Sequence, residues 1–219
     1  MRKTAATNAK RVRIGEHAPE SEGGPRRRLL AAAARLFYEE GVHVVGIDRL
    51  LDEAGVAKAS LYTHFGSKDG LVRAYLEEHL EVRRAHVEMV LARYDSPRER
   101  LLGMFADAQA LLTRTAFRGC RFLNASAEAR PEESIVAVTE EYRTWLRTVF
   151  SDLARAAGAR DPKRLGRQLA LLYDGVAVAA RLDGDRSGAG IAARSAAAAL
   201  LDAATVAAPV GRQQRRAAR

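Results

Sequence analysis

Apolar residues recur along most of the chain at intervals of three and four, which is the period of an amphipathic α-helix. The first such stripe includes Leu29, Leu36 and Phe37, and it predicts a helix over about 25–40 that ends near Gly41. The short Val and Ile clusters are bounded by glycine, so none of them predicts a strand. The pattern therefore predicts an all-α fold of nine helices.

Residues that favour helix N-termini mark several of the later starts. Ser67 is a suitable cap for a helix that runs to about Tyr94. Ser96-Pro97-Arg98-Glu99 has the form of a capping box and opens a helix to about Thr115. The other helices are expected around 47–54, over 58–65, over about 119–129, from after Pro131 to Ala157, from Asp161 to about Leu182, and over the Ala-rich 191–208 after a loop at 183–190.

Two polar stretches flank the helical region. Residues 1–24 and 207–219 are basic and lack apolar periodicity, so both are expected to be disordered tails. The front tail either contacts phosphates or is simply solvated, and the sequence leaves both alternatives open. Between the tails, the helices divide into a three-helix unit at 25–75 and a larger unit at 76–206.

Composition limits the compartment and the class of partner. The 219 residues carry a formal charge of +9, which suggests a polyanionic partner, with nucleic acid as the first candidate. Residues 26–75 hold eight basic and six acidic side chains, so binding there must depend on their arrangement. Cys120 is the single cysteine, and no signal peptide or membrane-spanning run is evident. A cytoplasmic protein, neither exported nor embedded in a membrane, is the expectation.

The short helix expected at 58–65 has few apolar anchors. Leu61 and Phe65 lie one turn apart and are expected to point inward. Together with the preceding helix and the turn at Gly55, this helix forms a helix-turn-helix whose other face is free to enter a major groove. That face mixes donors, an acceptor and methyl groups, the types that reach base edges and phosphates: Lys58, Ala59, Ser60, Tyr62, Thr63 and His64. An ordinary solvated helix is the alternative.

The stretch LLAAAARLFYEEGVHVVGIDRLLDEAGVAKASLYTHFGSKDGLVRAYL resembles the DNA-binding domain of the TetR family of bacterial transcriptional repressors. The resemblance implies that the third helix reads the major groove and that Tyr62, His64 and Lys68 hold phosphates. Gly46 departs from the family, because Thr or Ser usually caps the second helix there, and Leu51 stands where Ala is commoner. The DNA-contacting residues are predicted to be Arg26, Arg27, Ile47, Lys58, Ala59, Ser60, Tyr62, Thr63, His64 and Lys68, with Arg28 completing an arginine cluster at the first helix's start.

The same resemblance implies that residues 76–206 bind a small-molecule inducer and form a homodimer. Small residues in the eighth and ninth helices allow the close backbone approach of a four-helix bundle built from two helices of each subunit. A two-fold axis would set two recognition helices in successive major grooves, about 34 Å apart. The expected partners are therefore a double-stranded palindromic operator and an unknown inducer that releases the protein from it.

Residues 118–128 resemble a GC-x-F-x-N-x-x-x-E segment found in one branch of the family. We hypothesise a pocket for a small, mostly apolar ligand in which Asn124 is the polar anchor. The alternative is an ordinary packed core in which Asn124 bonds to backbone. The predicted pocket residues are Phe105, Cys120, Phe122, Leu123, Asn124, Tyr142, Trp145 and Tyr173.

Enzymatic and metal-binding patterns are missing from residues 76–206. No dinucleotide-binding or phosphate-loop glycine pattern, zinc spacing or Gly-x-Ser-x-Gly occurs there. No catalytic residue, cofactor or metal is predicted, and His79 and His86 are expected on the surface. Three alternatives remain: an enzyme with Cys120 as nucleophile, redox or electrophile sensing at Cys120, and a sequence-tolerant DNA-compacting protein.

Overall fold

The computed structural model describes residues 23–113, 117–131 and 133–205, and the regular secondary structure of these residues is entirely helical. The all-α prediction with nine helices is confirmed for them. Apart from residues 23 and 24, the predicted tails lie outside the described residues. The helices are α1 (Pro25–Glu40), α2 (Ile47–Ala54), α3 (Lys58–Phe65), α4 (Lys68–Leu91), α5 (Pro97–Leu112), α6 (Arg121–Glu128), α7 (Ser134–Ala156), α8 (Pro162–Leu182) and α9 (Arg186–Thr205).

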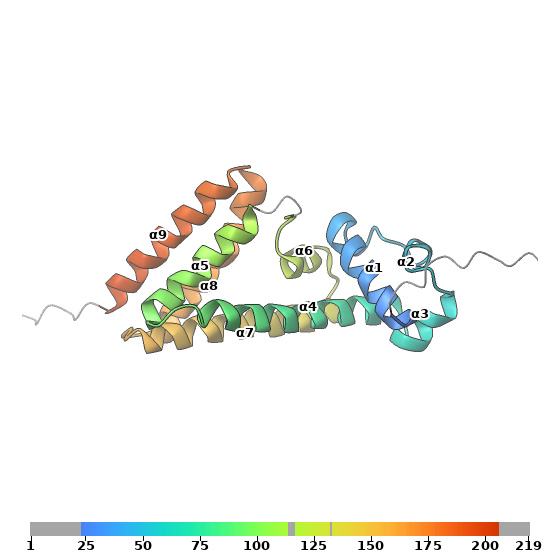
Figure 1. The fold of residues 1–219 in the computed structure, drawn as a ribbon, viewed down its shortest axis with the longest axis horizontal. Helices are drawn as coiled ribbons and strands as arrows, with labels where there is room; N and C mark the ends of the chain where they lie inside the picture. The colour runs from blue at the N-terminus through green and yellow to red at the C-terminus, as the bar shows by residue number, and fades with distance from the viewer. Residues whose placement is uncertain (1–22, 114–116, 132, 206–219) are drawn as a thin grey trace, which may run out of the picture.

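Helices α1, α2 and α3 form a small unit at one end of the molecule (Figure 1). Leu29, Leu36, Leu50 and Leu61 are fully buried at its centre. Gly55 ends α2 with a φ of 60°, a left-handed conformation that glycine adopts without a Cβ penalty. The sharp turn at Gly55 therefore sets α3 across α2.

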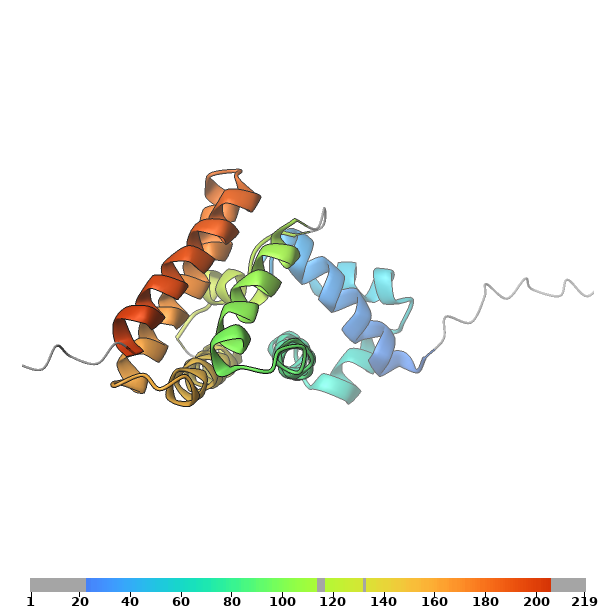
Figure 2. The same ribbon diagram turned by 60° about the vertical axis from the view of Figure 1, so that its left-hand side comes forward.

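The long helix α4 joins this unit to the rest of the chain (Figure 1). It packs against α1 and α3 at one end and against α5 and α7 at the other. Helices α8 and α9 lie side by side at the edge far from α1, α2 and α3 (Figure 2). The shorter α6 lies between the two units, against α7.

The helices of the larger unit approach closely at glycine. A Cβ placed on Gly166 of α8 would lie 2.8 Å from the backbone nitrogen of Ser151 in α7. A Cβ on Gly190 of α9 would meet Gln109 of α5 at 2.6 Å. Glycine is therefore required at both crossings for the helices to pack at this distance.

The predicted caps agree with the structure. The Ser67 side chain accepts from the Gly70 N–H at 2.9 Å, and Ser96 and Glu99 form the capping box. The prediction that 183–190 is a loop is wrong in its second half, since α9 begins at Arg186. Asp185 explains the early start, because its carboxylate accepts from the Gly188 N–H at 2.8 Å and so caps the first turn.

Candidate nucleic-acid interface and cavity

One face of α3 is open to solvent at the end of the molecule. Leu61 is fully buried and Phe65 packs against the core, as the spacing predicted. Tyr62 keeps 47% of its surface exposed. Of the other predicted contact residues on this helix, Lys58, Ala59, Thr63 and His64 are exposed and Ser60 is half-buried.

The arginines at the start of α1 separate into two roles. Arg26 and Arg27 are exposed, and the Arg26 guanidinium lies 5.5 Å from the centre of the Phe65 ring on α3. Arg28 instead donates to the carbonyl oxygens of Ala54 at 3.1 Å and Gly55 at 3.3 Å. Because those carbonyls end α2, Arg28 caps that helix, and the phosphate cluster of Arg26, Arg27 and Arg28 stays a prediction.

Two other predicted DNA contacts lie partly inside the protein. Ile47 is half-buried against the core, and Gly46 before it gives α2 no side-chain cap. Lys68 is also half-buried at the start of α4. Burial lowers the pKa of Lys68, while the nearby carboxylates of Glu128 and Glu133 act in the opposite direction. Lys68 therefore lies beside α3 and also interacts with carboxylates at the end of α6 and just before α7.

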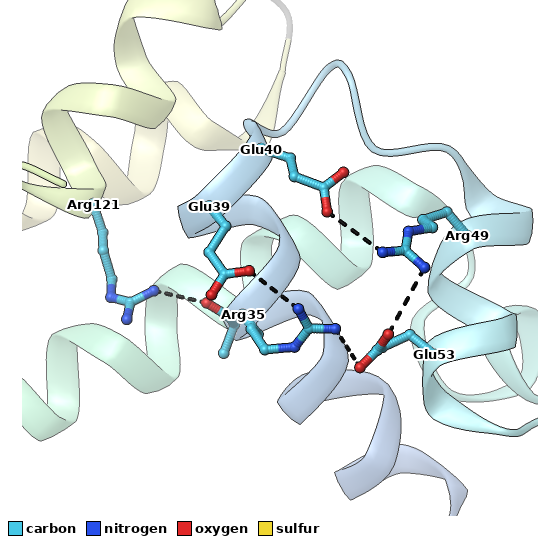
Figure 3. Close-up of polar contacts among 7 residues, drawn as sticks. Arg35, Glu39, Glu40, Arg49, Glu53 and Arg121 are labelled. Atoms are coloured by element: carbon cyan, nitrogen blue, oxygen red, sulfur yellow. Dashed lines mark hydrogen bonds and ion pairs between the residues drawn. The ribbon is translucent and has the colours of Figure 1, made fainter. Parts of the chain in front are cut away.

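Four ion pairs lie on α1 and α2, and two of them, Arg35 with Glu53 and Arg49 with Glu40, link the two helices (Figure 3). Arg35 pairs with Glu53 and, at 3.1 Å, with Glu39. Arg49 lies 3.7 Å from Glu40 and 3.9 Å from Glu53. These pairs are solvent-exposed, so each contributes at most about 1 kcal/mol. Together they offset three carboxylates of the α1–α3 unit that would otherwise repel a polyanion.

A cavity of about 410 Å³ lies in the larger unit, within the size range of small-molecule sites. Its wall includes the first turn of α6, the middle of α4, the end of α5 and the second half of α8. Tyr38 of α1 also lines it. The lining residues are Tyr38, His79, Val82, Arg83, His86, Ala108, Leu111, Leu112, Phe117, Gly119, Cys120, Arg121, Phe122, Tyr142, Tyr173, Asp174, Val176 and Ala177.

Half of the predicted pocket residues line this cavity. Cys120, Phe122, Tyr142 and Tyr173 do so, with the rings of Phe122 and Tyr142 stacked at 4.0 Å. The other four predicted residues, Phe105, Leu123, Asn124 and Trp145, are absent from its lining. Phe105 is buried in the core behind Tyr173, and Trp145 lies beyond Tyr142.

Asn124, the predicted polar anchor, already has two partners within the protein. Its side-chain nitrogen donates to the Arg118 carbonyl at 3.0 Å, and its oxygen accepts from Arg181 of α8 at 2.9 Å. Through these bonds Asn124 ties α6 to the neighbouring loop and to α8. The backbone bond is the arrangement that the packed-core alternative specified.

The cavity holds charged groups that were not predicted there. Arg83 donates to the Tyr173 hydroxyl and lies 3.5 Å from Asp107. Asp107 also contacts His86 at 2.8 Å. His79 and His86 are half-buried cavity residues, so their prediction as surface residues is wrong.

The signal for these residues was present in the sequence but was not used. His79 and Arg83 are one turn apart on α4, on the side that also carries the buried Leu76, Leu80 and Val87. Polar residues at core positions of an amphipathic stripe are expected to face a polar or hollow interior. The polar residues His79 and Arg83 within this apolar stripe therefore mark the cavity side of α4 in the sequence.

His79 is expected to make stability depend on pH. Burial first, then the charges of Arg121 and Arg83, lower its pKa to about 4 from the usual 6.5. Between these values the unfolded chain binds a proton that the folded chain does not, so stability is lost as the pH falls. The expected loss is about 2 kcal/mol per chain between pH 7 and pH 5. Urea unfolding at fixed protein concentration measures it.

The glutamine variant His79→Gln removes this titration, so its free energy of unfolding should fall less over the same interval. His64→Gln is the matched control, because His64 is exposed on α3. Equal pH dependence in wild type and His79→Gln would contradict the assignment.

The described residues show neither a membrane span nor a metal site. None of the helices within the described ranges is long and apolar enough to cross a membrane. Residues 23–113, 117–131 and 133–205 contain no group of three or more His, Cys, Asp or Glu side chains placed to hold a metal ion.

Comparison with known proteins identifies the relatives of this architecture. The family described as bacterial regulatory proteins, tetR family, matches residues 29–75, which hold α2, α3 and most of α1. A crystal structure of a TetR-family transcriptional regulator from Streptomyces coelicolor is 32% identical, with a TM-score of 0.78, covering 83% of this chain and 96% of that one. A putative TetR transcriptional regulator from Streptomyces avermitilis is 36% identical, with a TM-score of 0.74, covering 83% and 98%.

Curated relatives match over a shorter stretch. The transcriptional activator FasR of Mycolicibacterium smegmatis is 38% identical over 89 residues, 41% of this chain and 40% of FasR. The transcriptional repressor KstR2 of the same organism is 33% identical over 87 residues, 40% of this chain and 42% of KstR2. The chain thus spans about two fifths of the length of these two proteins, which act in opposite directions. The two Streptomyces structures align with this chain over nearly their whole length. They show, with the family match, that this chain is a member of the TetR family of DNA-binding transcriptional regulators and not an enzyme.

Proposed function

We propose that the protein is a dimeric repressor that acts in the cytoplasm, binds a palindromic operator and is released from it by a small-molecule inducer. The observation that carries the proposal is the exposed face of α3 around Tyr62, in the three-helix unit at one end of the molecule. Lys58, Tyr62 and His64 supply phosphate donors there, and Thr63 supplies groups that can reach base edges. Arg26 and Arg27 extend the positive charge beside α3.

An apolar stripe on α8 supports the homodimer. Leu171, Val178 and Leu182 recur at helical spacing and keep 67%, 47% and 76% of their surfaces exposed. Gly175 lies on the same face with open space around it. Ile191 of the adjacent α9 is exposed as well. Large apolar side chains gathered on one face favour burial against a second copy of that face, which a two-fold axis provides.

The contacts of α6 and of the residues just before it support regulation by a ligand. Tyr38 of α1 lines the cavity, its hydroxyl donates to the Gly119 carbonyl at 3.0 Å, and it accepts from the Arg118 N–H at 2.7 Å. At the other end of α6, Glu128 accepts from the His43 N–H at 2.9 Å. A ligand that favours a different position of α6 would shift α1, by no more free energy than its differential affinity for the two arrangements.

Selection of DNA by the purified full chain tests the proposal. Duplexes retained from a random pool should share an inverted repeat with half-sites about one helical turn apart. The selected duplex should then bind at least about a thousandfold more tightly than random duplex at the same salt concentration. A compacting protein would bind both equally, and that result would overturn the proposal. Placing the selected site upstream of a reporter gene in cells should lower the reporter's transcription, whereas a rise would replace repression by activation.

A further inference from the structure

The cavity contains more positive than negative charge. Arg83 is opposed by Asp107, and Asp174 is paired with Arg143. The remaining cation is Arg121, which has no carboxylate within 4 Å among the described residues. Burial raises the pKa of Tyr142 and of Tyr173, so both phenols are uncharged at neutral pH and do not offset it.

Arg121 is positioned by contacts that leave its charge without an anionic partner. Its Nη1 donates to the Ala34 carbonyl of α1 at 2.8 Å, as Figure 3 shows, and to the Tyr75 hydroxyl at 3.1 Å. Its guanidinium lies 3.8 Å from the centre of the Tyr38 ring. Neutral oxygens and a ring face hold the group in place, but a carboxylate is a much stronger acceptor for a guanidinium.

The rest of the cavity wall suits a flat, apolar body. Phe117, Phe122, Tyr142 and Tyr173 contribute aromatic rings, and Leu111 and Leu112 add aliphatic surface. His79 stays neutral between Arg83 and Arg121, which agrees with a positive potential in this space. An apolar wall with a cationic group at one place fits an amphipathic anion better than a neutral or cationic compound.

We propose that the cavity takes an aromatic organic anion, such as an aryl carboxylate, and that Arg121 binds its anionic group. This inference rests on the ligand-responsive function proposed above and names the class of inducer. The anion competes with the Ala34 carbonyl for the Arg121 guanidinium. Occupancy of the cavity therefore weakens a direct bond between α6 and α1, which carries the change to the DNA-binding unit.

Three probes with one ring system and different charges test the ligand class. They are 2-naphthoate, 2-naphthamide and 2-naphthylmethylammonium, and calorimetric titration of the full chain measures their dissociation constants. We expect 2-naphthoate to bind at least about tenfold more tightly than the amide, with the ammonium weakest. Equal affinity for the amide and the carboxylate, or no binding of 2-naphthoate at millimolar concentration, would overturn the proposal.

Variants of Arg121 test the assigned residue. Arg121→Gln should remove the preference for 2-naphthoate, whereas Arg121→Lys, which keeps the charge, should retain part of it. Arg118→Gln is the matched control, because Arg118 is exposed and lies outside the cavity lining. Thermal unfolding checks that each variant folds. Preference retained in a folded Arg121→Gln protein would assign the anion to another group and overturn this part.

Binding of the selected DNA, measured without any probe, separates this inference from the proposed function. Loss of the charge preference with DNA selectivity intact refutes only the ligand class. Absence of DNA selectivity refutes the repressor function whatever the probes do. Addition of 2-naphthoate should weaken retention of the selected duplex in wild type and leave it unchanged in Arg121→Gln.

Discussion

Affinity for the selected DNA should fall on the order of a thousandfold when Lys58 and Tyr62 are both replaced by alanine, because the proposed dimer would then lose four contacts of about 1 kcal/mol each. Both side chains are exposed on α3, so the thermal unfolding temperature should stay close to that of wild type. Fluorescence anisotropy with the labelled duplex measures the affinity at fixed salt.

The salt dependence of binding identifies the kind of contact. Lys58→Ala alone should make the negative slope of log affinity against log salt shallower by about two, since the proposed dimer would lose two phosphate contacts. Lys163→Ala is the matched control, because this lysine is exposed at the start of α8, far from α3. A double variant that binds within threefold of wild type would show that this face of α3 does not meet DNA.

The second large effect is expected at the apolar stripe of α8. With Leu171 and Val178 both replaced by glutamate, the protein should sediment as a monomer, because two charged groups per subunit would have to be buried without partners. Affinity for the selected DNA should then fall by roughly a thousandfold, as the two half-sites no longer bind as one linked unit. Analytical ultracentrifugation and the same anisotropy assay measure the two effects.

The control for this prediction is Met89→Glu. Met89 is also a large exposed apolar residue, but it lies on α4. Its replacement should leave the mass of the assembly unchanged. Sedimentation of the doubly substituted protein as a dimer would place the subunit contact elsewhere.

Local signals in the sequence predicted the helices well. The caps at Ser67, Ser96 and Asp161 act within three residues of themselves, so their effect is readable without the fold. The inward positions of Leu61 and Phe65 likewise follow from helical spacing. The predicted start of α9 is too late because the glycine and serine residues of 186–190 favour a loop, whereas the N-terminal cap at Asp185 allows the helix to begin at Arg186.

The site depended on contacts between residues far apart in the chain, and those were not predictable. Arg28 looked like a phosphate ligand by composition, yet it reaches carbonyls 26 and 27 residues away. Asn124 bonds to Arg118 and to Arg181 of α8, and the 57 residues between Asn124 and Arg181 put that second partner beyond any local pattern. The resemblance indicated the architecture, but it did not indicate the charged side chains inside the cavity, whose partners lie on other helices: Arg83 of α4 donates to Tyr173 of α8, and Arg121 of α6 donates to Tyr75 of α4.

Tyr38 belongs to α1 and yet forms part of the cavity wall. Under the proposed function, the residues that select the ligand and those that select the DNA therefore do not belong to separate parts of the chain. A chimaera that takes its first 66 residues from a relative with another side chain at position 38 also has an altered cavity wall. The ligands that release it from DNA should therefore change together with the DNA sequence that it binds.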